Sequence, residues 1–366
     1  MEKVINIELV QNTNIMIREE LKDIYKIYLN INKTQNTIVS MFWSVYLNLL
    51  NLGMIDYLEK NYNVELRKKL KYKKAIKSIR GRTKSDELSF EDRYNKINTL
   101  NKETHEDFIK MSSFVSKHRF LKDLIDNLGV YYIDFKPIGN TFLYATLFKP
   151  ILKNKEDLKQ HLFDFGKEQG QIFSALMKCF SIEQNDNIDV NVFIVKYKDF
   201  NTTKKNNGLL KKDIDINVGL KLLDIICNIN YYQIIICKVL PNNSTLRYRL
   251  AYIIWNTIYN NIEKMCNSEI FIKSPLNVKE YESILEKQKI FNKRNFRNCM
   301  FHYDMKDSIS DNCYNNKLMF FGLIQQEFNI SDNEYKTNIE IALNDILILL
   351  EKDILKPQHT LNDFHD

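Results

Sequence analysis

Glycine and proline are scarce in this chain, which has 9 Gly and 5 Pro among its 366 residues. Turn-rich all-β folds need many of both, because these residues readily adopt the backbone conformations of tight turns. The scarcity therefore disfavours an all-β fold and makes long helices the default. With 44% apolar residues and 12% aromatic residues, a chain of this length can build the cores of two or three domains.

The six cysteines are scattered, and no two of them form a C-x-x-C pair. No set of histidines accompanies them, so the ligand spacing of a zinc site is missing. The scatter also disfavours the disulfide framework of small secreted domains. The patterns H-E-x-x-H and G-K-[ST] do not occur, which argues against zinc-protease and P-loop chemistry. No cofactor is expected.

A signal-peptide pattern is also missing, because polar and charged residues interrupt the first residues, MEKVINIELVQN. No apolar run in the sequence is expected to reach the roughly 20 residues of a transmembrane helix. These two observations predict a cytoplasmic protein with no membrane partner.

The net charge of +7 is concentrated in residues 67–84, which contain no acidic residue and are called the basic segment below. Its basic residues are Arg67, Lys68, Lys69, Lys71, Lys73, Lys74, Lys77, Arg80, Arg82 and Lys84. Such a segment often binds a nucleic-acid backbone, since neutralising phosphates releases counterions. The alternative is a solvated basic helix or a disordered arm, and the sequence alone supports both.

The most informative stretch is FNKRNFRNCMFHYD, residues 291–304, in which Arg297, Asn298 and His302 form the pattern R-N-x-x-x-H. A guanidinium can hold phosphate oxygens through its planar donors, and an imidazole can transfer a proton near neutral pH. Side chains five apart on a regular helix lie about 140° from each other. Arg297 and His302 would therefore meet only if the first turn were irregular or if Arg297 reached around the helix. Otherwise they are a surface charge and a polar residue at a helix end.

The pattern resembles the R-N-x-x-x-H signature of the HEPN superfamily of helical RNA-cutting domains. This superfamily includes abortive-infection proteins, toxins of toxin–antitoxin pairs and nuclease domains of RNA-guided CRISPR effectors. The resemblance covers about residues 243–355, and no family is recognised in the first 240 residues. It implies a metal-independent endoribonuclease that acts in antiphage defence or as a toxin. Because this chain has one copy of the motif, it also implies a homodimer, with an antitoxin, activator or guide RNA as a further partner.

The resemblance also implies roles for individual residues. His302 would serve in acid–base catalysis on the ribose 2′-OH, Arg297 would stabilise charge on the phosphorane, and Asn298 would orient the imidazole or the phosphate. Tyr303 and Asp304 would support these groups, Asp304 through its charge. The candidate RNA-binding residues are Arg294, Arg67, Lys68, Lys69, Lys71, Lys73, Lys74, Lys77, Arg80 and Arg82. The alternative is a non-catalytic RNA-binding or scaffolding protein, or a subunit of an RNA-guided ribonucleoprotein, in which Arg297 and His302 would not matter.

Hydrophobic periodicity predicts a mainly α fold. A largely helical N-terminal region (1–127) precedes a mixed or helical middle region (128–240) with a small β element. A HEPN-like helical bundle (241–356) and a tail (357–366) follow the break at Leu240–Ser244. Helices are expected over residues 15–30, 38–62, 155–180, 245–266, 278–291, 317–327 and 333–355, with a helix that carries the R-N-x-x-x-H pattern after residue 291. Residues 218–237 form a buried helix or a helix followed by a strand.

Three local features are expected within this plan. Gly53 interrupts the second helix, and Ser244 or Thr245 caps the first helix of the bundle. Residues 129–150 form a hairpin or an extended crossing segment, with a turn at Pro137–Asn140, and residues 190–200 form a strand.

Overall fold

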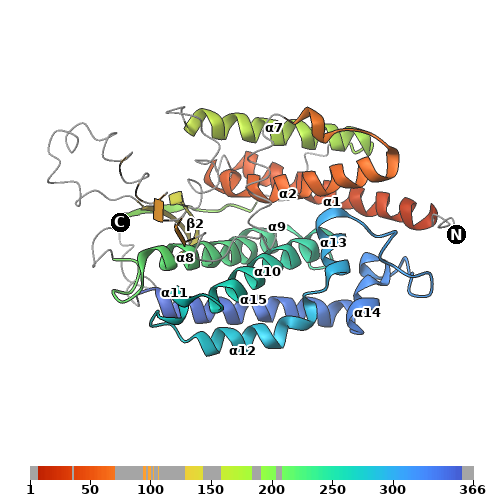
Figure 1. The fold of residues 1–366 in the computed structure, drawn as a ribbon. Coiled ribbons are helices and arrows are strands. Elements are labelled where there is room, and N and C mark those ends of the chain that lie inside the picture. Colours follow the sequence, from red (N-terminus) through yellow and green to blue (C-terminus); the bar gives the residue numbers. More distant parts are fainter. Residues whose placement is uncertain are drawn as a thin grey trace.

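The computed structural model describes residues 7–34, 37–70, 128–142, 158–183, 191–202 and 208–356, together with a few positions between 94 and 106. The fold is mainly α with one small three-stranded sheet, which confirms the predicted fold class. The helices stack in layers, with α7 outermost over α2, α1 and α2 over the central helices, and α15 and α12 on the far side (Figure 1).

The N-terminal layer consists of α1 (Ile7–Lys33) and α2 (Thr37–Tyr62), with α7 (Leu158–Cys179) packed on α2. Gly53 does not interrupt α2, contrary to the expectation. A Cβ atom at this position would lie 2.4 Å from the carbonyl oxygen of Phe301, so the glycine allows α2 to approach the chain near residue 301 closely. Glycine destabilises a helix relative to alanine, but at this position the missing Cβ is what permits the close packing.

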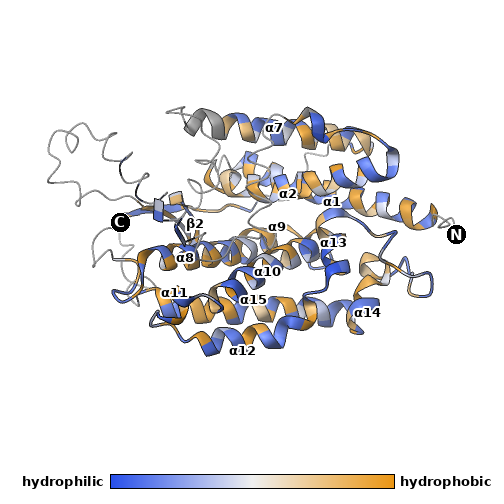
Figure 2. Cartoon of the chain, viewed as in Figure 1, coloured by the Kyte–Doolittle hydropathy of each residue, from blue (hydrophilic) through white to orange (hydrophobic). Residues whose placement is uncertain are grey.

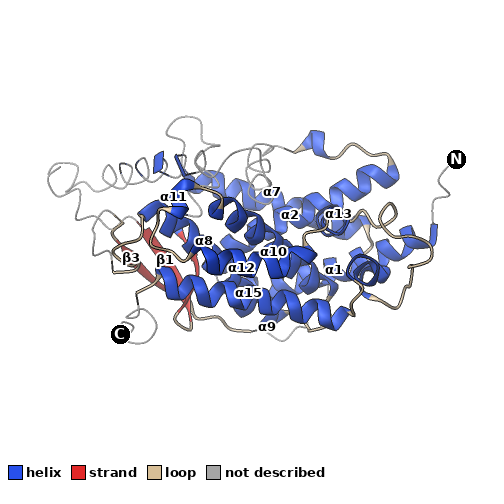
Figure 3. Cartoon of the chain, turned by 60° about the horizontal axis from the view of Figure 1, so that its bottom comes forward, coloured by secondary structure: helices blue, strands red, loops and turns tan. Residues whose placement is uncertain are grey.

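The sheet has the order β2-β1-β3, with antiparallel pairs formed by β1 (Leu128–Ile133), β2 (Lys136–Asn140) and β3 (Lys196–Phe200). The hairpin is confirmed, but its predicted turn is wrong: Pro137–Asn140 lies inside β2. The turn is Asp134–Phe135, both with positive φ (48° and 64°), because such two-residue turns match the twist of the paired strands. Figure 3 shows the sheet at one end of the helical layers, against α8.

The central layer contains α8 (Ile216–Tyr231), which continues through a π-helical turn (Tyr232–Ile236) into α9 (Cys237–Val239). Among the residues that the structure describes, two helical stretches are long and apolar enough to cross a membrane, contrary to the expectation: 38–62 (mean hydropathy 1.6) and 216–239 (mean hydropathy 1.3). The structure buries 72% and 67% of their apolar windows, and buried core helices pass the same test.

The C-terminal part begins with α10 (Thr245–Cys266), which Ser244 caps by accepting a hydrogen bond from the amide of Arg247 at 3.2 Å. The remaining elements are α11 (Glu269–Ile272), α12 (Val278–Gln288), a 3-10 turn (Lys289–Phe291), α13 (Arg294–His302), a second 3-10 turn (Met319–Gly322), α14 (Leu323–Phe328) and α15 (Asp332–Ile354). The buried residues of α12 are Tyr281 and Leu285, and the outer side of this helix is hydrophilic (Figure 2).

One hydrophobic core crosses the sequence break at 240–244. Helix α1 packs on α10, and α2 packs on α13, so buried residues of the N-terminal helices join those of the C-terminal helices in one cluster. Helix α13, which carries the R-N-x-x-x-H pattern and is called the motif helix below, therefore lies between the two parts of the chain.

Candidate active site at the end of the motif helix

The motif helix is held by one apolar side and by its last turn. Phe296, Cys299 and Met300 recur at helical spacing and are buried, with Phe296 packed edge-on against Tyr252 at a ring-centroid distance of 4.8 Å. The helix ends because Tyr303 adopts the left-handed conformation (φ 56°, ψ 30°), from which its amide donates to the carbonyl of Cys299 at 3.0 Å. His302 is thus the last helical residue.

A fully buried cluster of Glu20, Arg249 and Tyr303, called the inner cluster below, fixes this helix end. Arg249 Nη1 donates to the carbonyl oxygens of Cys299 and Met300 at 2.8 Å each, and Arg249 Nε lies 3.0 and 2.9 Å from the two carboxylate oxygens of Glu20. The guanidinium thus adds a second donor to the Cys299 carbonyl, which also accepts the Tyr303 amide, and it binds the Met300 carbonyl in the last turn, where a helix end favours a positive charge.

Tyr303 closes the inner cluster. Its hydroxyl donates to Glu20 Oε2 at 2.6 Å, and its ring lies 3.8 Å from the guanidinium carbon of Arg249. Burial raises the pKa of Tyr303 well above its ordinary value, so the hydroxyl stays protonated as a donor. The sequence assigned Tyr303 a supporting role at the motif, and the structure places it beneath the helix end, hydrogen-bonded to α1.

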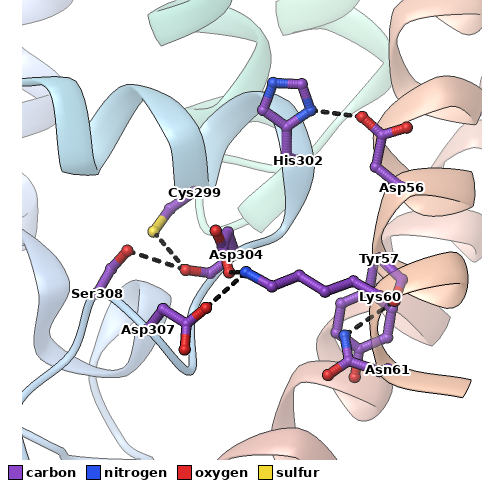
Figure 4. Close-up of polar contacts among 9 residues, drawn as sticks. All are labelled: Asp56, Tyr57, Lys60, Asn61, Cys299, His302, Asp304, Asp307 and Ser308. Carbon is purple, nitrogen blue, oxygen red and sulfur yellow. Dashed lines mark hydrogen bonds and ion pairs between the residues drawn. The ribbon is translucent and has the colours of Figure 1, made fainter. Parts of the chain in front are cut away.

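The imidazole of His302 is held from α2. Its Nδ1 lies 2.6 Å from Asp56 Oδ2, and the other ring nitrogen, Nε2, points away from Asp56 (Figure 4). The His302 side chain is 32% exposed, whereas that of Asp56 is 10% exposed. A carboxylate on Nδ1 favours the tautomer with its proton there, which leaves Nε2 as the atom that can exchange a proton with a substrate.

Asp56 also forms an ion pair with Arg67, whose guanidinium contacts Oδ1, the oxygen that does not face His302. Arg67 Nε lies 3.2 Å from Glu59 Oε2, and the amides of Leu66 and Arg67 donate to Glu59 Oε1 at 2.8 and 2.7 Å. Asp56, Glu59, Arg67 and His302 are called the outer cluster below. It joins the first residue of the basic segment to the imidazole through one carboxylate.

Lys60, one turn after Asp56 on α2, binds the loop that follows the motif helix. Its ammonium lies 2.5 Å from both Asp304 and Asp307 (Figure 4). Partial burial lowers the pKa of Lys60, but the hydrogen bonds and charges of Asp304 and Asp307 outweigh it and raise the pKa overall. Asp304, which the sequence placed at the imidazole, therefore contacts Lys60, and Asp56 is the acid at His302.

Arg297 and Asn298 are half-buried on the motif helix. The amide of Arg297 donates to the carbonyl of Lys293 at 2.9 Å, so the helix is regular there and the irregular first turn is not formed. The guanidinium carbon of Arg297 lies 5.9 Å from the ring centroid of Phe301. The hydrogen bond and ion pair seen for His302 go to Asp56 on α2, not to Arg297 or Asn298. Asn298, one turn before His302, lies on the same side of the helix.

Of the other predicted RNA-binding residues, some lie near the outer cluster and the motif helix, and the rest lie outside the residues that the structure describes. Arg294 is exposed at the start of the motif helix, and Lys68 is exposed and paired with Glu65 at 2.8 Å. Lys69 belongs to the 3-10 turn Arg67–Lys69. Outside the described residues lie Lys71, Lys73, Lys74, Lys77, Arg80, Arg82 and Lys84. Nucleic-acid binding by the basic segment stays a prediction.

Cys299 lies inside the motif but is not a candidate nucleophile. It is completely buried, burial raises its pKa to about 12, and its thiol donates to the carbonyl of Asp304 at 3.2 Å. A thiolate is the reactive form, so this cysteine acts as a small apolar residue of the helix. Within the described ranges no group of three His, Cys, Asp or Glu side chains could hold a metal ion.

Sequence reasoning missed the residues that hold the motif: Asp56, Glu59, Lys60, Glu20 and Arg249. One signal was available, since α2 is apolar for most of its length and its only charged residues are Asp56, Glu59 and Lys60 near its end. Charges grouped at one end of an apolar helix suggest a polar contact there. Comparison with known protein families, with curated proteins and with solved structures finds no match for this chain.

Proposed function

We propose that the chain is a metal-independent endoribonuclease in which His302 is the acid–base group. The observation that carries the proposal is the His302–Asp56 pair, a partly exposed imidazole whose Nδ1 lies 2.6 Å from a largely buried carboxylate. This is the arrangement that general acid–base catalysis needs, because the carboxylate orients the ring and stabilises the imidazolium. The resemblance of Arg297, Asn298 and His302 to the HEPN pattern supplies the substrate class, RNA.

In the proposed reaction His302 Nε2 takes the proton of a ribose 2′-OH, and the 2′-oxygen attacks the adjacent phosphorus. The bond between phosphorus and the 5′-oxygen breaks, and a proton returns to that oxygen. The products are a 2′,3′-cyclic phosphate and a 5′-hydroxyl end, so no water is consumed. Arg297 stabilises the charge on the phosphorane oxygens, and Asn298 orients the phosphate or the ring. DNA lacks the nucleophile and is not cut.

A regular motif helix places Arg297 and His302 about 140° apart, which makes it difficult for one chain to bring both to one phosphate. We therefore propose a homodimer in which His302 of one copy and Arg297 of the other share the substrate. The proposed setting is the cytoplasm, in antiphage defence or as a toxin, with an antitoxin, activator or guide RNA as a regulator. Light scattering of the purified protein tests the dimer, and a monomer that cleaves RNA would contradict it.

The activity is tested with purified protein and one RNA in EDTA, beside a DNA of the same sequence. His302→Ala is expected to reduce cleavage about 10²- to 10⁴-fold, the usual contribution of a general acid or base. Arg297→Ala is expected to reduce it about 10²- to 10³-fold. Lys273→Ala is the control for loss of a surface charge, since Lys273 contacts Glu269 on α11 and is 75% exposed. The cleaved RNA should end in a cyclic phosphate.

Two outcomes would reject the proposal. RNA cleavage that survives both substitutions would place the activity elsewhere in the chain. A wild-type protein that never cuts but copurifies with RNA would favour the second candidate, a non-catalytic RNA-binding protein or ribonucleoprotein subunit. The observation that favours this candidate is the basic segment, so substitutions there, rather than at His302, would then abolish RNA binding.

A further inference from the structure

Arg67 differs from the other residues of the basic segment that the structure describes. Its guanidinium contacts Asp56 and Glu59, whose side chains are 10% and 23% exposed. The neighbouring Lys68 contacts Glu65 in an ion pair whose side chains are 75% and 71% exposed. Ion pairs as exposed as the second contribute little to structure, whereas partly buried charge pairs fix geometry. Arg67, itself 43% exposed, is therefore tied to two less exposed carboxylates, whereas Lys68 forms its ion pair at the surface.

We propose that Arg67 is a positioning residue of the active site, which aims Asp56 at His302, and not primarily an RNA contact. The proposal rests on the function proposed above. Asp56 has two carboxylate oxygens, and Arg67 contacts Oδ1 while His302 contacts Oδ2. With Oδ1 held by a guanidinium, rotation of the carboxylate is restricted and Oδ2 stays directed at the imidazole.

Glu59 makes Arg67 a fixed partner. One carboxylate oxygen of Glu59 accepts the amides of Leu66 and Arg67, which sets the backbone, and the other lies 3.2 Å from Arg67 Nε, which sets the side chain. Arg67 also separates two acids that lie one turn apart on α2, Asp56 and Glu59. Without this cation the two carboxylates would repel each other, and Asp56 would lose its orientation toward His302.

The proposal gives Arg67 and Lys68 different roles although they are neighbours with the same charge. Arg67→Met removes a cation together with the contact to Asp56, and Lys68→Met removes a cation alone. Both substitutions are expected to weaken the binding of a long RNA similarly, because both reduce the charge of the basic segment. Only Arg67→Met is expected to disturb the imidazole of His302.

The first measurement is a long-range ¹H–¹⁵N correlation spectrum of the full-length protein with ¹⁵N-labelled histidine, in which His302→Ala assigns the His302 signals. In the wild type the neutral ring should carry its proton on Nδ1, as a hydrogen bond to Asp56 requires. In Arg67→Met the signals should show a mixture of both tautomers. Lys68→Met should keep the wild-type His302 pattern, and Arg67→Lys, which keeps the charge, should recover part of it.

The second measurement is turnover of a dinucleotide, whose single phosphate is the one that is cleaved, so that no further phosphate is present for Arg67 to bind. Arg67→Met is expected to lower kcat at least about tenfold with KM changed less than about twofold, the result for a group that acts on the transition state rather than on binding. Glu59→Gln should also lower kcat, because it weakens the ion pair that holds Arg67 and leaves the charge of Arg67 in place. It protects the test against misfolding of Arg67→Met, and its His302 signals should shift the same way.

The outcomes separate the two proposals. If Arg67→Met and Glu59→Gln keep the wild-type His302 signals and Arg67→Met raises only KM for long RNA, Arg67 is an RNA contact and the positioning proposal is wrong, while the nuclease stands. If the wild type does not cleave RNA but both variants change the His302 tautomer, the positioning role stands and the nuclease proposal fails.

Discussion

Two clusters of charged side chains meet at the end of the motif helix, and they differ in their access to solvent. In the inner cluster the side chains of Arg249 and Glu20 are both 0% exposed. In the outer cluster exposure rises from 10% at Asp56 to 32% at His302 and 43% at Arg67. Each cluster uses a carboxylate from an N-terminal helix, Glu20 from α1 and Asp56 from α2.

The partners of the two carboxylates explain the difference. Glu20 holds Arg249, which binds backbone carbonyls of the motif helix, so the inner cluster fixes where the helix ends. Asp56 holds the imidazole of His302, a side chain that solvent can reach. Breaking a buried ion pair is costly, whereas an exposed one contributes little to stability. Substitutions in the inner cluster should therefore change stability, and those in the outer cluster should change stability less and act on the proposed RNA cleavage instead.

The largest expected effect on stability is that of Arg249→Met. It leaves the Glu20 carboxylate buried without its cation and removes the donor to Cys299 and Met300, which should lower the free energy of unfolding by about 3–5 kcal/mol. Urea denaturation followed by circular dichroism measures this. The double variant Glu20→Gln/Arg249→Met is the control, since it removes both charges and should be less destabilised than Arg249→Met alone. A loss below about 1 kcal/mol would mean that the inner cluster does not fix the helix end.

A smaller effect is expected for Gly53→Ala, which acts between the clusters. The added Cβ would lie 2.4 Å from the carbonyl oxygen of Phe301 and 3.1 Å from Tyr303 Cε2, so α2 must move away from the motif helix. Overpacking of this kind costs about 1–3 kcal/mol. Because Asp56 is three residues further along α2, its distance to His302 should also increase, and RNA cleavage should fall.

Gly166→Ala on α7 is the matched control, because no atom lies within 4 Å of a Cβ at this position. It should stabilise the protein by about 0.5–1 kcal/mol, the gain of alanine over glycine in a helix. Equal effects of the two substitutions in thermal melts would contradict the close contact at Gly53.

Lys60→Met should have a still smaller effect, about 0.5–1 kcal/mol, since the Lys60 side chain is 42% exposed and water screens its pairs with Asp304 and Asp307. The pKa of Lys60 is raised in the folded protein, so its stabilisation is fully present below its ordinary pKa of 10.5 and is lost as the pH rises through the raised pKa. The stability difference between wild type and variant should thus be constant from neutral pH to about pH 10 and shrink above it. A difference that disappeared below pH 9 would contradict the raised pKa.

Local patterns in the sequence were sufficient for most of the fold. Periodic apolar residues located α1, α2, α10 and α15, and Ser244 marked the start of α10. The hairpin turn was misplaced because Pro137–Asn140 has turn-forming residues, whereas the actual turn uses Phe135 at positive φ, which that residue type rarely adopts. Gly53 was misread because its reason lies in a contact with residue 301.

The candidate site was less predictable, because it depends on contacts between distant parts of the chain. The motif identified His302, but the acid that holds it is 246 residues away, and Arg249 is 229 residues from Glu20. Nothing in the local sequence marks Arg249 as buried, since a charged residue usually faces solvent. A fully buried arginine is possible here because a carboxylate and two carbonyl groups accept its hydrogen bonds. These partners lie far away in the sequence, so no local pattern indicates them.

The comparison of the clusters also predicts the reactivity of individual thiols. Cys299 lies on the buried side of the motif helix, where burial raises its pKa to about 12. Cys179, in contrast, is exposed. Iodoacetamide at pH 8 should therefore modify Cys179 in the native protein and leave Cys299 unmodified until urea unfolds the chain, as mass spectrometry of peptides can show. In Gly53→Ala, Cys299 should react before global unfolding, because displacement of α2 opens the helix end. Equal rates of modification of both cysteines in the folded protein would mean that solvent reaches the buried side of the motif helix. The distinction between the two clusters would then fail.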